Sequence, residues 1–261
     1  MHGHGGFDPH TPASARIYDF LLGGKDNFAA DRSVGEKLTA IFPEVAELAA
    51  QNRQFLARAS AWAAHQGVRQ FLDLGCGMPS EPNVHEVVQG VDRAAQVTYV
   101  DNDRGVVTHL RALSEHGNAG VSVLDADVRD VPGVLKSVSD SLDLSRPACV
   151  IMGCLLQYFT AERARSLVTG YTEALVPGSY LVVSVGCGDS QRAEEFYHTY
   201  SGWASQAYNH PADDVATFFG SLPLVPPGLV DASQWRPDVP PPAPLPDRGG
   251  QILVGVASVT G

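Results

Sequence analysis

The sequence predicts an α/β protein with a doubly wound, mostly parallel sheet of seven strands, an antiparallel last strand and a helical N-terminal segment. Beyond Gly67, short β-rich runs alternate with helical runs, the order expected of a sheet covered by helices on both faces. Several β-rich runs are almost continuously apolar, as in strands buried on both sides. A proline-rich stretch before the final β-rich run favours a long hairpin, and therefore an antiparallel last pair.

The spacing of apolar residues predicts the individual elements, and glycine and proline residues mark where they end. Strands are predicted at residues 70–74, 96–100, 120–124, 148–152, 180–185, 224–229 and 252–259. Helices are predicted at residues 83–89, 105–114, 132–138, 161–174, 192–200 and 212–219. Pro226 and Pro227 assign the sixth strand to an edge or a bulge, because proline cannot donate to a ladder. Residues 237–246 hold six prolines and are expected to form an extended surface loop.

The N-terminal part is predicted to be helical and to cap the sheet. Ser14 is the expected N-cap of a first helix, which Gly23-Gly24 ends. A second helix is expected over residues 33–41, and a third runs from Pro43 to about residue 62 with a break near Asn52. The chain therefore divides into a flexible leader (1–12), a helical cap or lid (13–66) and a sheet domain (67–261).

Composition and charge exclude several classes of function. The net charge is −11 and no basic run occurs, so a nucleic-acid partner is not expected. No apolar run approaches the ~20 residues that span a bilayer, so no membrane partner is expected. The four cysteines form no C-x-x-C pair, and no secretion signal precedes them. These features predict reduced thiols, a cytoplasmic location and no metal site.

A glycine turn follows the first predicted strand, in the segment FLDLGCG that ends at Gly77. Gly75 and Gly77 allow the backbone to approach a ligand closely and to adopt positive φ. Asp73 and Cys76 lie in the same segment. In a doubly wound sheet the ligand crevice lies at the carboxyl ends of the strands where the strand order reverses. The turn is therefore the predicted centre of a binding site.

Acidic residues follow the next two strands. Asp101, followed by Asn102, is placed to accept hydrogen bonds from both hydroxyls of a ribose. Asp127 is placed to accept from an adenine amino group, with the backbone N–H of Val128 on a ring nitrogen. Three carboxylates in register at successive strand ends favour an adenosine site over simple capping of strand ends.

Two adenosine ligands fit this pattern to different degrees. A dinucleotide site requires G-x-G-x-x-G opening directly into a helix. Here the third glycine is missing, and Gly77 is followed by two prolines and Glu81, which suit a diphosphate poorly. S-adenosylmethionine has no phosphate and carries a sulfonium cation, so an acidic pocket favours it.

These residues resemble class I S-adenosylmethionine-dependent methyltransferases, which have a Rossmann-like seven-stranded sheet ending in an antiparallel hairpin. The segment ARIYDFLLGGKDNFAADR, residues 15–32, looks like the hallmark of an actinobacterial S-adenosyl methyltransferase family once labelled a domain of unknown function. The resemblance covers nearly the whole chain. It implies S-adenosylmethionine as cofactor, bound at Gly75, Gly77, Asp101, Asn102, Asp127 and Val128. Asp73, Cys76 and Gly153 complete the expected contacts along the strand ends.

The glycine-broken segment from Gly23 to Arg32 is too polar to be only a helix connection. Our hypothesis is that it folds over the cofactor as a lid, with Tyr18, Lys25 and Asn27 facing the methionine end. Lys25 or Arg16 would pair with the cofactor carboxylate. The alternative is a solvated loop that caps helices.

Methyl transfer needs mainly alignment of the acceptor and exclusion of water. A general base helps only when the acceptor starts protonated, and Tyr158 and His85 are the catalytic candidates. The predicted function is methyl transfer to an unidentified small molecule (EC 2.1.1.-). The alternatives are an S-adenosylmethionine-binding protein without methyl transfer, such as a cyclase-like enzyme or regulator, and an NAD-dependent oxidoreductase.

Overall fold

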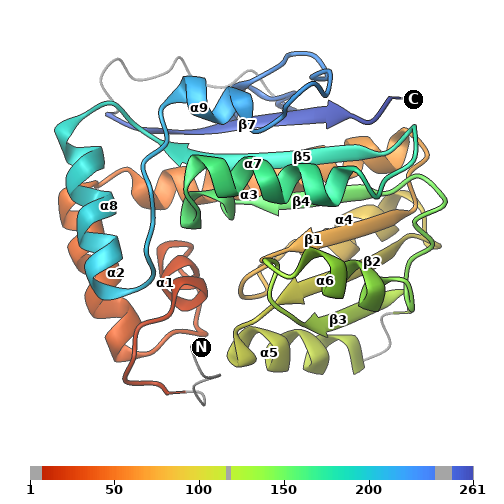
Figure 1. Ribbon diagram of the computed structural model, residues 1–261. Coiled ribbons are helices and arrows are strands. Elements are labelled where there is room, and N and C mark those ends of the chain that lie inside the picture. Colours follow the sequence, from red (N-terminus) through yellow and green to blue (C-terminus); the bar gives the residue numbers. More distant parts are fainter. Residues whose placement is uncertain (1–7, 116–118, 239–248, 261) are drawn as a thin grey trace.

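A single mixed sheet runs through the molecule, with helices on both of its faces (Figure 1). The computed structural model describes residues 8–115, 119–238 and 249–260, and within these ranges the sheet has seven strands in the order β3-β2-β1-β4-β5-β7-β6. The strands are β1 (Gln70–Leu74), β2 (Gln96–Asp101), β3 (Val121–Asp125), β4 (Cys149–Gly153), β5 (Tyr180–Cys187), β6 (Val230–Asp231) and β7 (Gln251–Ser258).

The strand order reverses beside β1. Both of its neighbours, β2 and β4, pair with it in parallel, so the chain passes to opposite sides of β1 as it continues. β7 pairs antiparallel with β5 and with β6, which confirms the predicted antiparallel last strand. A reversal of this kind leaves a crevice at the carboxyl ends of the strands, because successive connections turn to different faces.

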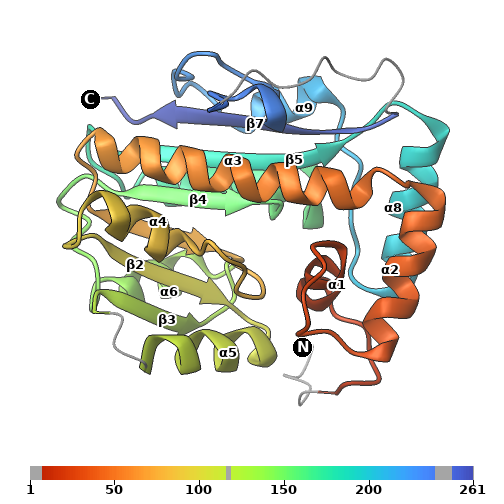
Figure 2. The same cartoon turned by 180° about the vertical axis from the view of Figure 1, so that it is seen from behind.

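Helices cover both faces and bury two apolar layers. One face carries α3 (Val45–His65), α4 (Val84–Val91) and α5 (Arg104–Glu115), seen toward the viewer in Figure 2. The other carries α6 (Val131–Val138), α7 (Ala161–Thr172) and α9 (Ala212–Thr217). All five residues of β1 are buried, the polar Gln70 and Asp73 as well as the three apolar ones, as expected for a strand covered on both sides.

Three helices stand beside the carboxyl ends of the parallel strands (Figures 1 and 2). They are α1 (Ser14–Leu21), α2 (Ala29–Ile41) and α8 (Gln191–Trp203), the last of which comes from the other end of the chain. A small apolar cluster joins them, with Ile17, Leu38 and Tyr200 among its buried members. The molecule therefore places helical walls over the edge of the sheet where a ligand is expected.

Several sequence predictions were wrong in detail. The third helix continues without a break past Asn52, because this side chain finds a polar partner in the tertiary structure. Ala13, not Ser14, is the N-cap of α1. The sixth strand is the short β6, while Leu224 forms only an isolated bridge to Ala257. Residues 1–7 of the predicted leader (1–12) and residues 239–246 of the predicted proline-rich loop (237–246) lie outside the described residues.

Candidate functional site

The glycine turn after β1 has the conformation that its residues predict. Gly75 and Gly77 have φ of +64° and +68°, in the left-handed region that favours glycine. A Cβ added to Gly75 would lie 2.6 Å from Cδ1 of Leu155, so the chain passes closely there. The backbone N–H of Gly75 donates to the Val100 carbonyl at 2.8 Å, which holds the turn against the end of β2.

Three carboxylates lie at or just beyond the ends of β1, β2 and β3. Asp101 accepts hydrogen bonds from the backbone N–H groups of Gly77 at 3.0 Å and Asp103 at 2.9 Å. Each of its oxygens retains a lone pair for a further donor. Asp127 accepts from Nε of Arg129 with both oxygens, each at 2.9 Å. Asp73 is buried, and no hydrogen bond from the described residues reaches its carboxylate.

These groups border one cavity of about 520 Å³ at the carboxyl edge of the sheet. The predicted site residues that line it are Tyr18, Asp73, Gly75, Cys76, Gly77, Asp101, Asn102, Asp127, Val128, Gly153 and Tyr158. They come from the N-terminal helix, the glycine turn and the ends of β2, β3 and β4. Residues far apart in the sequence thus meet at the reversal of strand order. We call this space the cofactor cavity.

Four predicted residues do not line the cofactor cavity. His85 is buried in α4, where its Nδ1 lies 2.9 Å from the Tyr99 hydroxyl, so it does not face the cavity that it was expected to serve. The amide of Asn27 donates to the Asp19 carboxylate at 2.8 Å instead of reaching a ligand. Lys25 is exposed to solvent. Arg16, the other expected cation, is held by Asp31 at 2.8 Å.

Two polar residues of α3 in the cavity wall were missed. Arg53 lines the cavity and donates to the Ser80 carbonyl at 2.9 Å. Asn52 is 1% exposed and donates to the Tyr18 hydroxyl at 2.8 Å, while its Oδ1 is buried without a partner among the described residues. In the sequence, Asn52 and Arg53 interrupt the apolar face of this helix, and such an interruption can indicate a binding site. We interpreted it instead as a break in the helix.

The electrostatics of the cofactor cavity favour a cation. Burial raises the pKa of Asp73 to about 7, with the nearby Asp101 carboxylate adding to the effect against the opposing Arg53. Burial also raises the pKa of Asp101. Both carboxylates therefore gain from a positive charge brought into the cavity, since it would offset their lost hydration.

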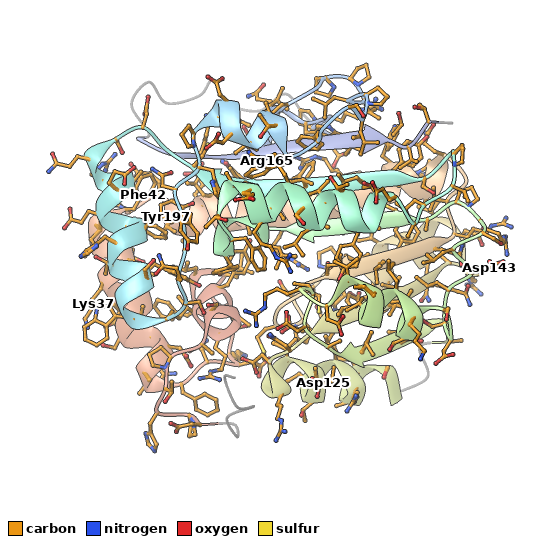
Figure 3. All side chains as sticks on the ribbon, viewed as in Figure 1. Lys37, Phe42, Asp125, Asp143, Arg165 and Tyr197 are labelled. Atoms are coloured by element: carbon orange, nitrogen blue, oxygen red, sulfur yellow. The ribbon has the colours of Figure 1, made fainter. Side chains whose placement is uncertain are left out.

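A second, smaller space of about 100 Å³ adjoins the cofactor cavity. Both are lined by Ser14, Tyr18, Cys154 and Tyr158. Its walls come from α1, α3, α8 and the ends of β5 and β7, and they are mostly apolar and aromatic. We call it the apolar chamber. Figure 3 labels two of its wall residues, Phe42 and Tyr197, beside α8.

Comparison with solved structures finds close matches over the whole chain. A protein from Thermobifida fusca YX, described as a methyltransferase, is 35% identical, with 97% of this chain and 96% of that chain covered and a TM-score of 0.90. A DUF574 family protein from Streptomyces avermitilis MA-4680 is 31% identical, with 96% and 98% covered and a TM-score of 0.89.

A more distant match shows the fold alone. The Burkholderia thailandensis 1,6-didemethyltoxoflavin-N1-methyltransferase, solved with its substrate and S-adenosylhomocysteine, is 15% identical, with 79% of each chain covered and a TM-score of 0.50. No curated protein matches the sequence. Among the described residues, no helix has the length and apolarity of a membrane span.

The sequence profile of S-adenosyl methyltransferases matches residues 3–260, almost the entire chain. This match decides against the dinucleotide alternative and agrees with the missing third glycine. The cofactor is S-adenosylmethionine, and the enzyme class is methyltransferase. The chain belongs to the S-adenosyl methyltransferase family.

Proposed function

We propose that this protein transfers the methyl group of S-adenosylmethionine to a small molecule bound in the apolar chamber. The observation that carries the proposal is the meeting of Asp73, Asp101 and Asp127 around one cavity that opens beside an apolar space. The cofactor supplies a methyl group that is already activated by the sulfonium. The protein then has to hold, align and shield the reactants.

The adenosine half of the cofactor suits the ends of β2 and β3. The two oxygens of Asp101 suit the two ribose hydroxyls, because both are already oriented by backbone N–H groups. Asp127, oriented by Arg129, and the backbone of Val128 suit the adenine. Close approach at the glycine turn fits the chain that joins the ribose to the sulfur.

The methionine end suits residues of α3. Arg53 is a cation in the cavity wall, and we assign it to the cofactor carboxylate in place of Lys25 or Arg16. The unpartnered Oδ1 of Asn52 and the carboxylate of Asp73 are acceptors for the ammonium group. Tyr18 accepts from the Asn52 amide and donates to the Ala49 carbonyl at 3.1 Å, so the orientation of Asn52 is determined.

Tyr158 stands where the cavity and the chamber meet. Burial raises its pKa well above the ordinary value, so it stays protonated at neutral pH and is unsuited to act as a base. Its hydroxyl lies 2.7 Å from that of Tyr200. We assign Tyr158 to positioning the acceptor and closing the reaction space against water.

Calorimetric titration of S-adenosylmethionine tests the cofactor assignments. Asp101→Ala and Arg53→Ala each remove a charged partner, and we expect roughly 10- to 100-fold weaker binding. Lys25→Ala serves as the matched control and should leave the dissociation constant within about twofold. Unchanged binding by Asp101→Ala, or a large loss in Lys25→Ala, would contradict the assignment.

Formation of S-adenosylhomocysteine when the protein and S-adenosylmethionine are incubated with a metabolite extract separates methyl transfer from binding alone.

The charge of the chain bears on the class of acceptor, and its cysteines bear on the cellular location. The acidic composition offers no clustered cations for phosphates, so the proposed acceptor is not a nucleic acid. All four cysteines are free thiols, two of them buried, which supports a reducing compartment and thus the cytoplasm. Fractionation of cells with an antibody to the protein tests this location.

A further inference from the structure

The apolar chamber has a defined boundary with the cofactor cavity. Cys154, one of the four residues shared by the two spaces, has φ of +48°, a left-handed conformation that is rare for a residue with a side chain. Strained backbone of this kind persists where surrounding structure imposes it, often at functional sites. Its backbone N–H is held by the Ser184 hydroxyl at 2.9 Å and the Ser184 carbonyl at 3.0 Å.

No Asp, Glu, Lys, Arg or His side chain occurs among the described residues that line the chamber. Aromatic rings form much of its wall: those of Phe42 and Phe196 meet edge to face at 6.2 Å, and those of Phe196 and Tyr200 stack at 6.2 Å. Arg192 packs over the Phe42 ring and pairs with Glu44 at 3.7 Å, but neither charge lines the chamber.

The polar groups of the wall are largely committed to one another. The hydroxyl of Tyr197 donates to the Gly186 carbonyl at 2.6 Å, and the side-chain oxygen of Gln157 accepts from the Gly186 N–H at 3.3 Å. The hydroxyls of Tyr158 and Tyr200 bond to each other. Burying an anion among such partners would be costly, because no cation lines the chamber among the described residues to neutralise it.

The thiols and tyrosine hydroxyls of the chamber wall are protonated at neutral pH, so they cannot take a proton from an acceptor. Burial raises the pKa of the thiols of Cys154 and Cys187 to about 11 each. It raises the pKa of the Tyr158, Tyr197 and Tyr200 hydroxyls as well. The wall therefore offers protonated hydroxyls and thiols but no base for an acceptor that must first be deprotonated.

We propose that the chamber takes an uncharged, ring-containing molecule whose acceptor atom carries a free lone pair, the chemistry of an aromatic ring nitrogen. The lone pair forms the new bond to the methyl carbon, and the carbon–sulfur bond breaks with its electron pair staying on sulfur. The acceptor takes up the positive charge that the sulfonium loses, so no proton has to leave. This inference rests on the proposed function.

The first test measures binding of two probes to the full chain loaded with S-adenosylhomocysteine. Isoquinoline is uncharged near neutral pH and has a ring nitrogen, whereas 2-naphthoate has an all-carbon bicyclic ring of the same size and a carboxylate. We expect isoquinoline to bind at least roughly tenfold more tightly. Equal or tighter binding of 2-naphthoate, or no binding of either probe, would overturn the proposal.

Variants of α8 assign the probe to the chamber. Ala193→Leu should weaken isoquinoline binding by roughly tenfold or more, because Ala193 lines the chamber and not the cofactor cavity. Phe196→Ala removes an aromatic wall and provides a second, less crowded variant. The exposed His198→Ala is the control on the same helix. Unaltered isoquinoline binding in both chamber variants would place the probe elsewhere and reject the proposal.

The product gives an independent readout. With methyl-deuterated S-adenosylmethionine and a metabolite extract, the labelled methyl group should appear on nitrogen, and an O-methyl or carboxyl-methyl product would overturn the proposal. Calorimetry with S-adenosylmethionine separates the two levels of inference. Weak cofactor binding by the unmodified chain would reject the proposed function, whereas tight binding with the wrong probe preference would reject only the acceptor class.

Discussion

At the scale of single residues, Asp73 is an acid held where its charge is disfavoured. Burial raises the pKa of its carboxyl to about 7, in the wall of the cofactor cavity. In the unfolded chain the same group titrates near its ordinary value of 3.8. As the pH rises from about 4 to 7, the unfolded chain therefore releases this proton before the folded protein does. The stability that Asp73 contributes at low pH is lost over this window.

Asp73→Asn should consequently stabilise the cofactor-free protein and weaken the cofactor complex. At about pH 8 we expect its free energy of unfolding in urea to exceed that of the unmodified protein by about 1–3 kcal/mol, with the difference vanishing near pH 4. Affinity of the unmodified protein for S-adenosylmethionine should rise between about pH 5.5 and 7.5, and Asp73→Asn should lose that dependence. The exposed Asp140→Asn is the control. A variant that is less stable at high pH would contradict this account.

At the scale of elements, Asp31 joins the start of α1 to the start of α2. Its fully buried carboxylate accepts from the backbone N–H groups of Ala13 at 2.9 Å and Phe28 at 2.8 Å, and from Nε of Arg16 at 2.8 Å. The carboxylate thereby satisfies free N–H groups at two helix starts and neutralises a buried cation. The glycine-containing turn between the helices is built around a second acid, Asp19.

Replacing Asp31 by alanine removes the carboxylate that neutralises the buried Arg16 guanidinium. We expect a loss of about 3–5 kcal/mol in the free energy of unfolding. Cofactor affinity should also fall, because α1 contributes Tyr18 to the cavity. The exposed Asp26→Ala in the same segment should cost about 1 kcal/mol or less. Chemical unfolding monitored by circular dichroism measures both variants, and a similar small cost for each would refute the bridging role of Asp31.

At the scale of the whole molecule, Trp235 ties the C-terminal part of the chain to α3. It is fully buried, and its ring meets those of Phe55 at 5.5 Å and Trp62 at 6.1 Å, edge to face. Arg58 of α3 donates to the carbonyls of Trp235 at 3.0 Å and Ala232 at 2.7 Å. These contacts hold the segment before β7 against the helix that also supplies Arg53 to the cavity.

Trp235→Ala should therefore cost about 3–5 kcal/mol of unfolding free energy by leaving a cavity in the core. Trp203, which is 54% exposed with Lys37 over its ring, offers a matched control whose removal should cost about 1 kcal/mol or less. Urea unfolding followed by tyrosine and tryptophan fluorescence compares the two. Equal costs would show that the Trp235 cluster does not stabilise the fold.

One physical cause explains which predicted residues line the cofactor cavity and which do not. Gly75, Asp101 and Asp127 line the cavity because each lies at or just beyond the end of a strand, and the ends of parallel strands meet at one edge. His85 follows the glycine turn closely in sequence. However, α4 carries it to the Tyr99 side chain, on the face of the sheet that α3 and α5 also cover. Arg53 was missed because its place depends on where the long helix α3 crosses that edge.

The sequence by itself determined the sheet, its antiparallel last strand and the edge at which the cofactor cavity lies. The apolar runs of the strands, the glycine turn and the acids after the strands are local features, so they can be recognised in the sequence without knowledge of tertiary contacts. Only the tertiary structure decided which cation lies in the wall of the cofactor cavity and which elements border the apolar chamber. The walls of the apolar chamber come from α1, α3, α8, β5 and β7, and no local pattern predicts how elements so distant in sequence pack around one space.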